Sequence, residues 1–179
     1  MEELSDEAIM MKVKEGNLAD LAMLFERYHV KLYNFFLRLT FDKIVSQDLT
    51  QNLFYRILKY RHTYKEKESG FKSWIYRMAR NVHSDHYRLE KRNNEYFKRV
   101  EPGHENMQEY DDTFKEDDFK KLERALQQLD PDHREIIVMS RFEGLKYDEI
   151  SKIRNMSVPA IKVQVHRTMK ELRKIYFGQ

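Results

Sequence analysis

Apolar side chains recur at three- and four-residue steps through most of the sequence, and this spacing is the strongest constraint on the fold. Between residues 18 and 39 the series reads Leu18, Leu21, Ala22, Phe25, Tyr28, Leu32, Phe36 and Leu39. Such spacing places the whole series on one side of an α-helix. Only five Gly and three Pro occur in 179 residues, and no stretch alternates apolar and polar residues as a half-buried strand does. The sequence therefore predicts an all-α protein.

Capping and breaking residues divide the pattern into separate helices. Ser5-Asp6-Glu7 opens a short first helix that Gly16 can close, and Asn17 can cap the second. Further helices are expected over residues 44–60, 71–91, 116–129, 131–142, 147–154 and 157–174. The stretch after the fourth helix is acidic and contains Pro and Gly, which is typical of a linker. We predict two small helical domains, residues 1–95 and 116–179, joined by an acidic linker over residues 96–115.

The net charge of +3 conceals an uneven distribution. Residues 61–99 carry eleven Lys or Arg and five Asp or Glu, and residues 152–174 carry seven and one. The strip between them, residues 101–118, holds eight acids and one Lys. Two basic blocks around an acidic strip indicate a polyanion as a partner.

The last helix has two different sides. Ser157 is placed to cap it and Pro159 suits its first turn. One side stacks Ile161, Val165, Thr168 and Leu172, which we expect to pack on the rest of the domain. The opposite side carries Lys162, His166, Arg167, Lys170, Arg173 and Lys174, with the apolar Val163 among them. Such a face is either a solvated basic surface or a DNA-binding surface.

The segment before this helix favours DNA. A short helix with Leu145, Ile150 and Ile153 precedes it across a tight turn. This is the spacing of a helix-turn-helix, whose second helix enters the major groove by its N-terminal half. Lys162, Gln164 and His166 can then reach base edges, and Val163 can touch a thymine methyl group. Arg167, Lys170 and Lys174 are placed for phosphates.

The helix over residues 71–91 also has an apolar and a basic side. Its inward stripe is Phe71, Trp74, Ile75, Met78, Val82 and Leu89, so we expect Trp74 in the core. Its outward ridge is Lys72, Tyr76, Arg80, His83 and Tyr87. Cationic groups interleaved with aromatic rings suit single-stranded or melted DNA.

The third helix has two apolar faces. Leu49, Leu53, Ile57 and Tyr60 form one of them. The other has Gln47, Gln51, Phe54 and Leu58, with Asp48 and Tyr55 beside it. The second face is either covered inside a helical bundle or exposed for a partner protein, and the pattern alone favours neither.

Several of these segments resemble the sigma-70 family of RNA polymerase factors. Gln47-Asp48-Leu49-Thr50-Gln51 with Phe54, followed by the run from Phe71 to Asn81, is similar to the family's region 2. Leu129-x-Pro131-x-x-Arg134, Tyr147-Asp148-Glu149-Ile150 and Ile161-Lys162-x-x-x-His166-Arg167 are similar to region 4. With both regions and only a short linker between them, the chain resembles the compact extracytoplasmic-function (ECF) subfamily over about residues 18–175.

The resemblance implies a sigma factor that binds core RNA polymerase and directs it to promoters. The implied contacts with the clamp of the largest polymerase subunit are Asp48, Gln51, Asn52, Phe54 and Tyr55. The implied contacts with the melted −10 element are Tyr64, Lys72, Tyr76, Arg77, Arg80, Asn81 and Tyr87, with the loop 61–70 forming a pocket for a flipped base. The implied contacts with the −35 element are Lys162, Val163, Gln164, His166, Arg167 and Lys170.

The resemblance also implies partners and has departures. Core RNA polymerase and promoter DNA are expected partners, together with an anti-sigma factor of the kind that is often membrane-bound. The family often carries a Thr or small residue and a Gly where this chain has Val158-Pro159-Ala160-Ile161, and a polar residue where it has Val163. Its promoter sequence therefore cannot be copied from relatives.

Other classes of protein fit the sequence less well. There is no Gly-rich phosphate loop, nucleophile motif or cofactor signature, and the chain has no Cys, so we expect neither an enzyme nor a cofactor. His83 and His86 lack the further ligands that a zinc site needs. No membrane span or signal peptide is recognisable, which predicts a cytoplasmic protein. A regulator that binds operator DNA without polymerase, and a pure protein-interaction module, remain the competing interpretations.

Overall fold

The computed structural model describes residues 4–68, 70–100 and 117–178, and every regular element in these ranges is helical. The N-terminal half contains α1 (Asp6–Glu15), η1 (Leu18–Asp20), α2 (Leu21–Thr40), α3 (Lys43–Tyr60), η2 (Arg61–Thr63) and α4 (Phe71–Val100). The C-terminal half contains α5 (Asp117–Gln128), α6 (Pro131–Ile137), the π-helical turn η3 (Val138–Phe142), α7 (Tyr147–Arg154) and α8 (Val158–Phe177). The all-α prediction is confirmed. Most of the predicted linker, residues 101–115, lies outside the described residues.

Capping residues set most helix ends where the sequence predicts them. Ser5 accepts a hydrogen bond from the Ala8 amide, and Gly16 ends α1 in the left-handed region at φ 110°. Asp130 caps α6 just before Pro131, and Ser157 caps α8. The prediction for Asn17 is wrong, because its side chain makes no capping bond and the chain forms the 3-10 turn η1 before α2 begins.

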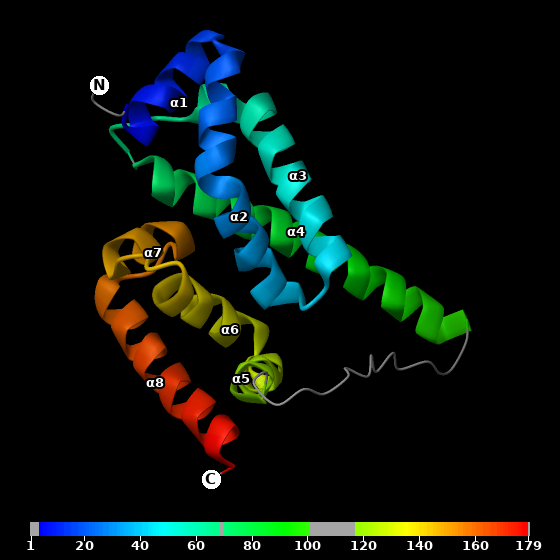
Figure 1. Cartoon of the computed structure of the whole chain (residues 1–179). Coiled ribbons are helices and arrows are strands. Elements are labelled where there is room, and N and C mark those ends of the chain that lie inside the picture. The colour runs from blue at the N-terminus through cyan, green and yellow to red at the C-terminus, as the bar shows by residue number, and fades with distance from the viewer. Residues whose placement is uncertain (1–3, 69, 101–116, 179) are drawn as a thin grey trace.

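Aromatic side chains fill the core of the N-terminal half. Phe71 packs edge-on against Tyr28 and Tyr64, and Tyr64 packs in the same way against Trp74. Trp74 is buried, as predicted. In Figure 1 the long α4 crosses behind α2 and α3, so one helix supports the whole half. Leu89 was expected in the inward stripe of α4 but is exposed, because it lies beyond the part of α4 that the other helices cover.

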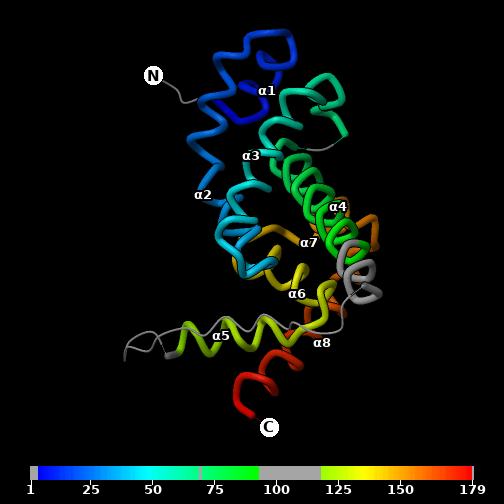
Figure 2. The backbone as a smooth tube through the Cα atoms, turned by 90° about the vertical axis from the view of Figure 1, so that its right-hand side faces the viewer, coloured from blue at the N-terminus to red at the C-terminus, as the bar shows by residue number. Residues whose placement is uncertain are grey.

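The C-terminal half is a smaller bundle around a helix-turn-helix. Asn155, at φ 53°, makes the tight turn between α7 and α8. Ile150 and Ile153 of α7 are buried together with Ile161 and Val165 of α8. Figure 2 shows α5 lying across the end of the molecule where α8 finishes. Phe119 of α5 exposes 67% of its surface, although it shares a helical stripe with the buried Leu126.

The two halves pack directly on each other. α4 contacts α7, while α2 contacts α6 and η3, and Figure 1 shows α6 and α7 beneath α2 and α4. Buried residues of both halves belong to one apolar cluster. The helix faces that meet here include one that the sequence suggested was directed outward.

Candidate nucleic-acid and polymerase interfaces

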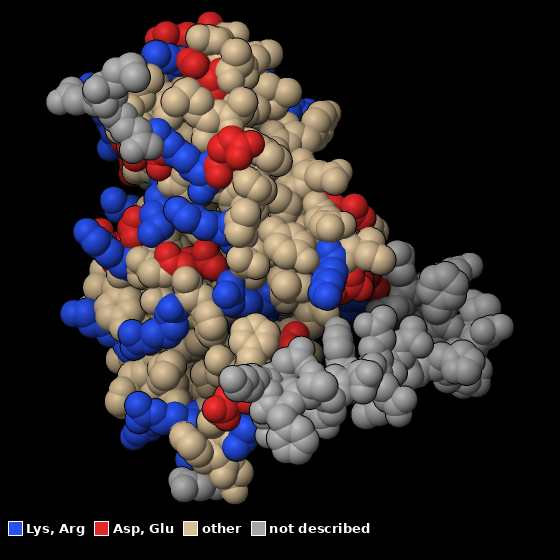
Figure 3. Space-filling view, viewed as in Figure 1, with Lys and Arg blue, Asp and Glu red and all other residues tan. Residues whose placement is uncertain are grey.

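The basic side of α8 lies open on the surface. Its inner residues Ile161, Val165, Thr168 and Leu172 are buried, as predicted. The outer residues Lys162, His166, Arg167 and Lys170 are exposed, and Val163 exposes 49% of its surface among them. Figure 3 shows Lys and Arg side chains gathered along the side of the molecule that α7 and α8 form. We call this surface, residues 162, 163, 166, 167 and 170, the open face.

Gln164 differs from its neighbours on α8. The structure places it half-buried, and its Oε1 is fully buried without a hydrogen-bond partner among the described residues. Its amide is therefore less accessible to a base edge than Lys162 or His166. Spacing alone did not indicate this. Gln164 lies at the border between the buried and the exposed side of the helix, where the apolar pattern favours neither.

The basic side of α4, in contrast, is covered by the C-terminal half. Lys72, Tyr76 and Arg80, which we call the covered ridge, all bond to acceptor oxygens across the contact, and the exposed Arg77 does so beside them. Only 1% of the Tyr76 surface is exposed. In the predicted outward ridge, Tyr76 is buried, Lys72, Arg80 and His83 are partly buried, and Tyr87 is exposed. The prediction that the ridge points outward is therefore wrong for Tyr76.

Glu143, which directly follows η3, accepts hydrogen bonds from Tyr76 and Lys72 of this ridge. The Tyr76 hydroxyl donates to its Oε2 at 2.6 Å, and Arg38 of α2 lies 3.5 Å from its Oε1. The ammonium group of Lys72 donates to the backbone oxygen of Glu143 at 3.4 Å. Burial, followed by the charge of Glu143 and the hydrogen bond to it, raises the pKa of Tyr76, so the phenol remains a donor.

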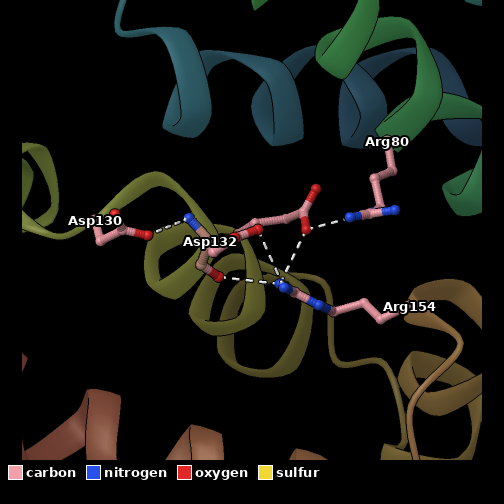
Figure 4. Close-up of polar contacts among 5 residues, drawn as sticks. Arg80, Asp130, Asp132 and Arg154 are labelled. Carbon is pink, nitrogen blue, oxygen red and sulfur yellow. Dashed lines mark hydrogen bonds and ion pairs between the residues drawn. The ribbon is translucent and has the colours of Figure 1, made fainter.

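Glu135 of α6 binds Arg80, the last residue of the ridge. Its Oε2 lies 3.0 Å from Arg80 Nε and 3.0 Å from Arg154 Nη1. Arg154 also bonds to the backbone and carboxylate oxygens of Asp132, at 3.0 and 3.1 Å. Figure 4 shows Arg80 reaching down from α4, while Arg154 reaches in from α7 below it. One carboxylate therefore links α4 of one half to α6 and α7 of the other.

Two further contacts close the boundary between the halves. Arg77 donates to the backbone oxygen of Lys152 at 2.9 Å. Arg134 donates to the backbone oxygens of Leu126, Gln127 and Leu129, and also to Leu39 at the end of α2 at 2.9 Å. Arg134 thus ties the last turn of α5 to the N-terminal half.

Sequence reasoning did not identify Glu135 and Glu143 as the partners of the covered ridge. Glu135 is next to Ile136 and Ile137 in the sequence and is almost completely buried. A carboxylate among inward-facing apolar positions is rarely buried without a cationic partner. The position of Glu135 beside apolar residues therefore indicated a buried acid with a cationic partner, although it could not show which residue that partner is.

The predicted −10 residues that do not belong to the covered ridge lie in three different places. Tyr64 is fully buried against Phe71 and Trp74, and burial raises its pKa to about 12, so its ring is not available at the surface. The loop after α3 borders a hollow of about 420 Å³ whose lining includes Arg56, Tyr60, Trp74, Arg77 and Asn81. Tyr87 is half-exposed further along α4. The hollow borders the loop where the resemblance places the base pocket, and that pocket stays a prediction.

The second face of α3 is largely open. Gln47, Asp48, Gln51, Asn52 and Tyr55 are exposed. Phe54 exposes only 8% of its surface, because its ring packs on Phe25 of α2 at a centroid distance of 4.8 Å. We call these five exposed residues the rim of α3. The rim is accessible, and Phe54 lies beneath it.

Neither a metal cluster nor a membrane-spanning helix is found in the part of the chain that the structure describes. Groups of three or more His, Asp or Glu with metal-binding geometry do not occur among those residues. The same residues contain no helix that combines the length and apolar character needed to cross a bilayer.

Comparison with protein families assigns both halves. Residues 24–93 match the sigma-70 region 2 family, and residues 119–172 match sigma-70 region 4. Together these matches span well over half of the chain and include α4 and the helix-turn-helix. The chain belongs to the sigma-70 family of RNA polymerase sigma factors. Within that family it is a factor of the ECF type.

Curated relatives agree with this assignment, and solved structures share the fold. The RNA polymerase sigma factor CarQ of Myxococcus xanthus is 29% identical, covering 93% of this chain and 94% of CarQ. The ECF sigma factor SigX of Bacillus subtilis is 28% identical, over 85% of this chain and 81% of its own. The fold is similar to that of CnrH, solved with the cytosolic domain of CnrY, with a TM-score of 0.73, 19% identity and coverage of 97% and 98%. It is also similar to RpoE, solved with the anti-sigma factor NepR from Bartonella quintana, with a TM-score of 0.70, 20% identity and coverage of 87% and 96%.

Proposed function

We propose that this ECF sigma factor divides promoter recognition between the open face of α8 and the covered ridge of α4. The open face reads the −35 element, with Lys162, Val163 and His166 nearest the bases and Arg167 and Lys170 on phosphates. The ridge and Asn81 hold the melted −10 strand once they are accessible. The phosphodiester chemistry belongs to the polymerase, and this chain supplies binding.

The observation that carries this proposal is that one chain holds two different cationic helix faces. One belongs to a helix-turn-helix and suits a duplex major groove. The other carries Tyr76 among cations and lies next to a hollow bordered by Trp74 and Tyr60, which suits unpaired bases. A regulator that binds operator duplex alone would need only the first face.

We propose that the exposed rim of α3 is the docking surface for core polymerase. Asp48, Gln51, Asn52 and Tyr55 are accessible there and lie on α3, which packs on α2 and α4 of the N-terminal half. Phe54 supports this rim from beneath through its contact with Phe25. Phe54→Ala is therefore expected to act by loosening the rim, whereas Gln51→Ala removes a direct contact.

An anti-sigma factor is the second protein partner that we propose. Support comes from the solved relative RpoE, whose structure was determined with the anti-sigma factor NepR. Whether that partner is anchored in a membrane is a separate part of the proposal. Purification of the chain from its native cells with crosslinking, followed by fractionation into membrane and supernatant, tests both parts.

In this proposal the two domains, residues 1–95 and 116–179, have separate tasks. A transcription assay tests both tasks together. Core RNA polymerase is mixed with this protein and genomic promoter fragments, and the transcripts are sequenced. We expect new start sites that share two upstream elements at fixed spacing. Tight binding of the chain alone to duplex DNA, with no new transcripts, would favour the operator-binding regulator instead.

Gln51→Ala gives a sharper test of the docking surface. It should weaken binding to core polymerase while leaving the helical circular dichroism and the thermal midpoint unchanged, since Gln51 is exposed. Lys59→Ala, also exposed on α3 but outside the proposed rim, is the matched control. Wild-type polymerase affinity in Gln51→Ala and in a folded Phe54→Ala would contradict the docking assignment.

A further inference from the structure

Helix α1 binds the chain at both ends of the connection from η2 to α4. Lys14, in the last turn of α1, donates from Nζ to the backbone oxygen of Tyr64 at 2.8 Å, directly after η2. Glu7, in the first turn of α1, accepts at its Oε1 a hydrogen bond from the Phe71 amide at 2.9 Å, where α4 begins. Two side chains of one helix therefore set the positions of both ends of this connection.

The bond from Glu7 supplies a cap that the residue before α4 cannot supply. Gly70 precedes α4, and its carbonyl oxygen accepts a hydrogen bond of the first helical turn from the Trp74 amide at 3.2 Å. A Gly has no side-chain oxygen for the free amides of that turn. The Glu7 carboxylate provides one, and its charge suits the positive end of the helix dipole. A Cβ at residue 70 would lie 3.3 Å from Glu7 Oε1, so Gly70 permits this close approach.

Aromatic rings connect both bound ends to the hollow beside α4. The ring of Tyr64 packs against Trp74 and Phe71 at centroid distances of 5.4 and 6.2 Å, and Phe71 lies 6.1 Å from Trp74. Trp74 in turn lines the hollow together with Tyr60. A shift of either bound end therefore moves a wall of the hollow.

Helix α1 is a fixed support for these two bonds. Its apolar side, Ile9, Met10 and Val13, is fully buried. Asp6, beside Glu7, pairs with Arg27 of α2 at 2.6 Å. A binding site on a loop keeps its geometry only where surrounding groups lock it, and bonds from charged side chains are the stronger class of hydrogen bond. The arrangement is thus suited to hold a recognition pocket in one shape.

We propose that Glu7 and Lys14 are positioning residues for promoter reading, which hold the walls of the hollow in the shape that accepts one unpaired base of the −10 strand. The proposal rests on the proposed function and adds α1 to it. The match to sigma-70 region 2 begins at residue 24, after α1 has ended. Tyr64, which is fully buried, then acts through Trp74 and does not touch DNA.

Six single variants separate the two bonds from the rest of α1. Glu7→Met and Lys14→Met remove the bonds and keep most of the side-chain length. Glu7→Gln and Lys14→Arg keep an acceptor and a donor at the same positions. Lys12→Met and Glu15→Met are the matched controls, because both residues are exposed on α1. Circular dichroism of each variant measures whether the helices remain.

Fluorescence of the free protein is the first readout. Trp74 is the single Trp of the chain, so quenching of its emission by acrylamide reports on the wall of the hollow. We expect the quenching constant to rise in Glu7→Met and in Lys14→Met. The conservative variants and the two controls should keep the wild-type value.

Promoter selection with core RNA polymerase is the second readout, on libraries varied at each −10 and −35 position. Tyr60→Ala removes a wall residue and so identifies the −10 position that the hollow reads. A single recognised base is worth about tenfold in promoter use, and we expect this preference to fall to about twofold in Glu7→Met and Lys14→Met. Preferences at the other positions should stay, and Glu7→Gln and Lys14→Arg should retain the full preference. Because each preference is a ratio, a lower yield of active protein does not change it.

Unchanged preference at that position in folded Glu7→Met and Lys14→Met would overturn the proposal, even if quenching increased. Equal weakening at every position, or loss of helix in both variants, would make α1 a general support of the fold and would also overturn it. A Tyr60→Ala chain that relaxes no −10 position would show that the hollow reads no base, with the same consequence.

The wild-type chain separates these results from the proposed function. Promoter-directed transcription by the wild-type protein, together with variants that select promoters as it does, would remove the positioning role of α1 alone. Absence of transcription with the wild-type protein would remove the proposed function itself.

Discussion

The open face of α8 and the covered ridge of α4 arise from the same kind of sequence pattern but are in opposite states. Each helix has an apolar side in the core and a cationic side opposite. Lys162 and Arg167 on α8 are exposed, whereas Arg80 and Tyr76 on α4 each meet a carboxylate from the other half. A cationic face read from sequence is therefore a capacity to bind anions, and the fold decides whether the chain itself fills it.

The largest expected effect comes from removing the Arg154 side chain, which binds the buried Glu135 at the boundary between the halves. Arg154→Met leaves the buried Glu135 with Arg80 as its remaining cation, and the side chains of Arg154 and Glu135 are only 6% and 7% exposed. Breaking a buried pair from one side costs about 3 kcal/mol. Urea unfolding should show this loss, while Arg167→Met on the open face should change the free energy of unfolding by less than about 0.5 kcal/mol. Equal effects at the two positions would mean that the two surfaces do not differ as described.

A pH series should reveal the covered state of His83, which lies on the same side of α4. Burial, followed by His86, Arg134 and Arg80, lowers its pKa from 6.5 to about 4. Between these values the unfolded chain binds a proton that the folded chain does not, so stability falls as the pH falls. On account of His83, the free energy of unfolding should be about 2 kcal/mol lower at pH 5 than above pH 6.5.

His83→Gln should remove that part of the pH dependence. Glu135 and Glu143 act in the opposite direction, because their raised pKa values make folding more favourable as the pH falls. The informative quantity is therefore the difference between the wild-type and His83→Gln profiles from urea unfolding. Parallel profiles would show that His83 is not buried in solution.

Substitutions on the open face should affect promoter choice without affecting stability. Lys162→Ala and His166→Ala each remove a group placed at base edges, at a cost of about 1.4 kcal/mol or tenfold in promoter use. Transcription from the native promoter with core polymerase measures this loss, and polymerase affinity should stay unchanged. Loss of polymerase binding in either variant would contradict the division of tasks between the two halves.

The smallest expected effect is at Val163. Val163→Ala removes two methyl groups that face outward, and loss of a contact with one thymine methyl group costs about 0.8 kcal/mol. Promoter libraries varied at each −35 position should show relaxed preference at a single base pair. Uniform weakening at all positions would instead place Val163 against the DNA backbone.

The sequence predicted individual helices better than it predicted their exposure. The inner side of α8 and the position of Trp74 follow from helical period alone, because an apolar stripe must be buried somewhere. The direction of the α4 ridge does not, since Tyr76 and Arg80 are covered by Glu143 and Glu135, which lie far away in the sequence. Phe119 shows the reverse case, an apolar residue in helical register with the buried Leu126 that is nevertheless exposed. Pairing between halves depends on tertiary contacts that a local pattern does not contain.

Hydroxyl-radical footprinting read by mass spectrometry tests the contrast between the two surfaces most directly. It should be done on the free chain, on the chain with core polymerase, and on that complex with promoter DNA. We predict that Tyr76 is protected in the free chain, becomes reactive when core polymerase binds, and is protected again by promoter DNA, while His166 is reactive until DNA is added. A Tyr76 that is reactive in the free chain, or that never becomes reactive on the polymerase, would contradict the account.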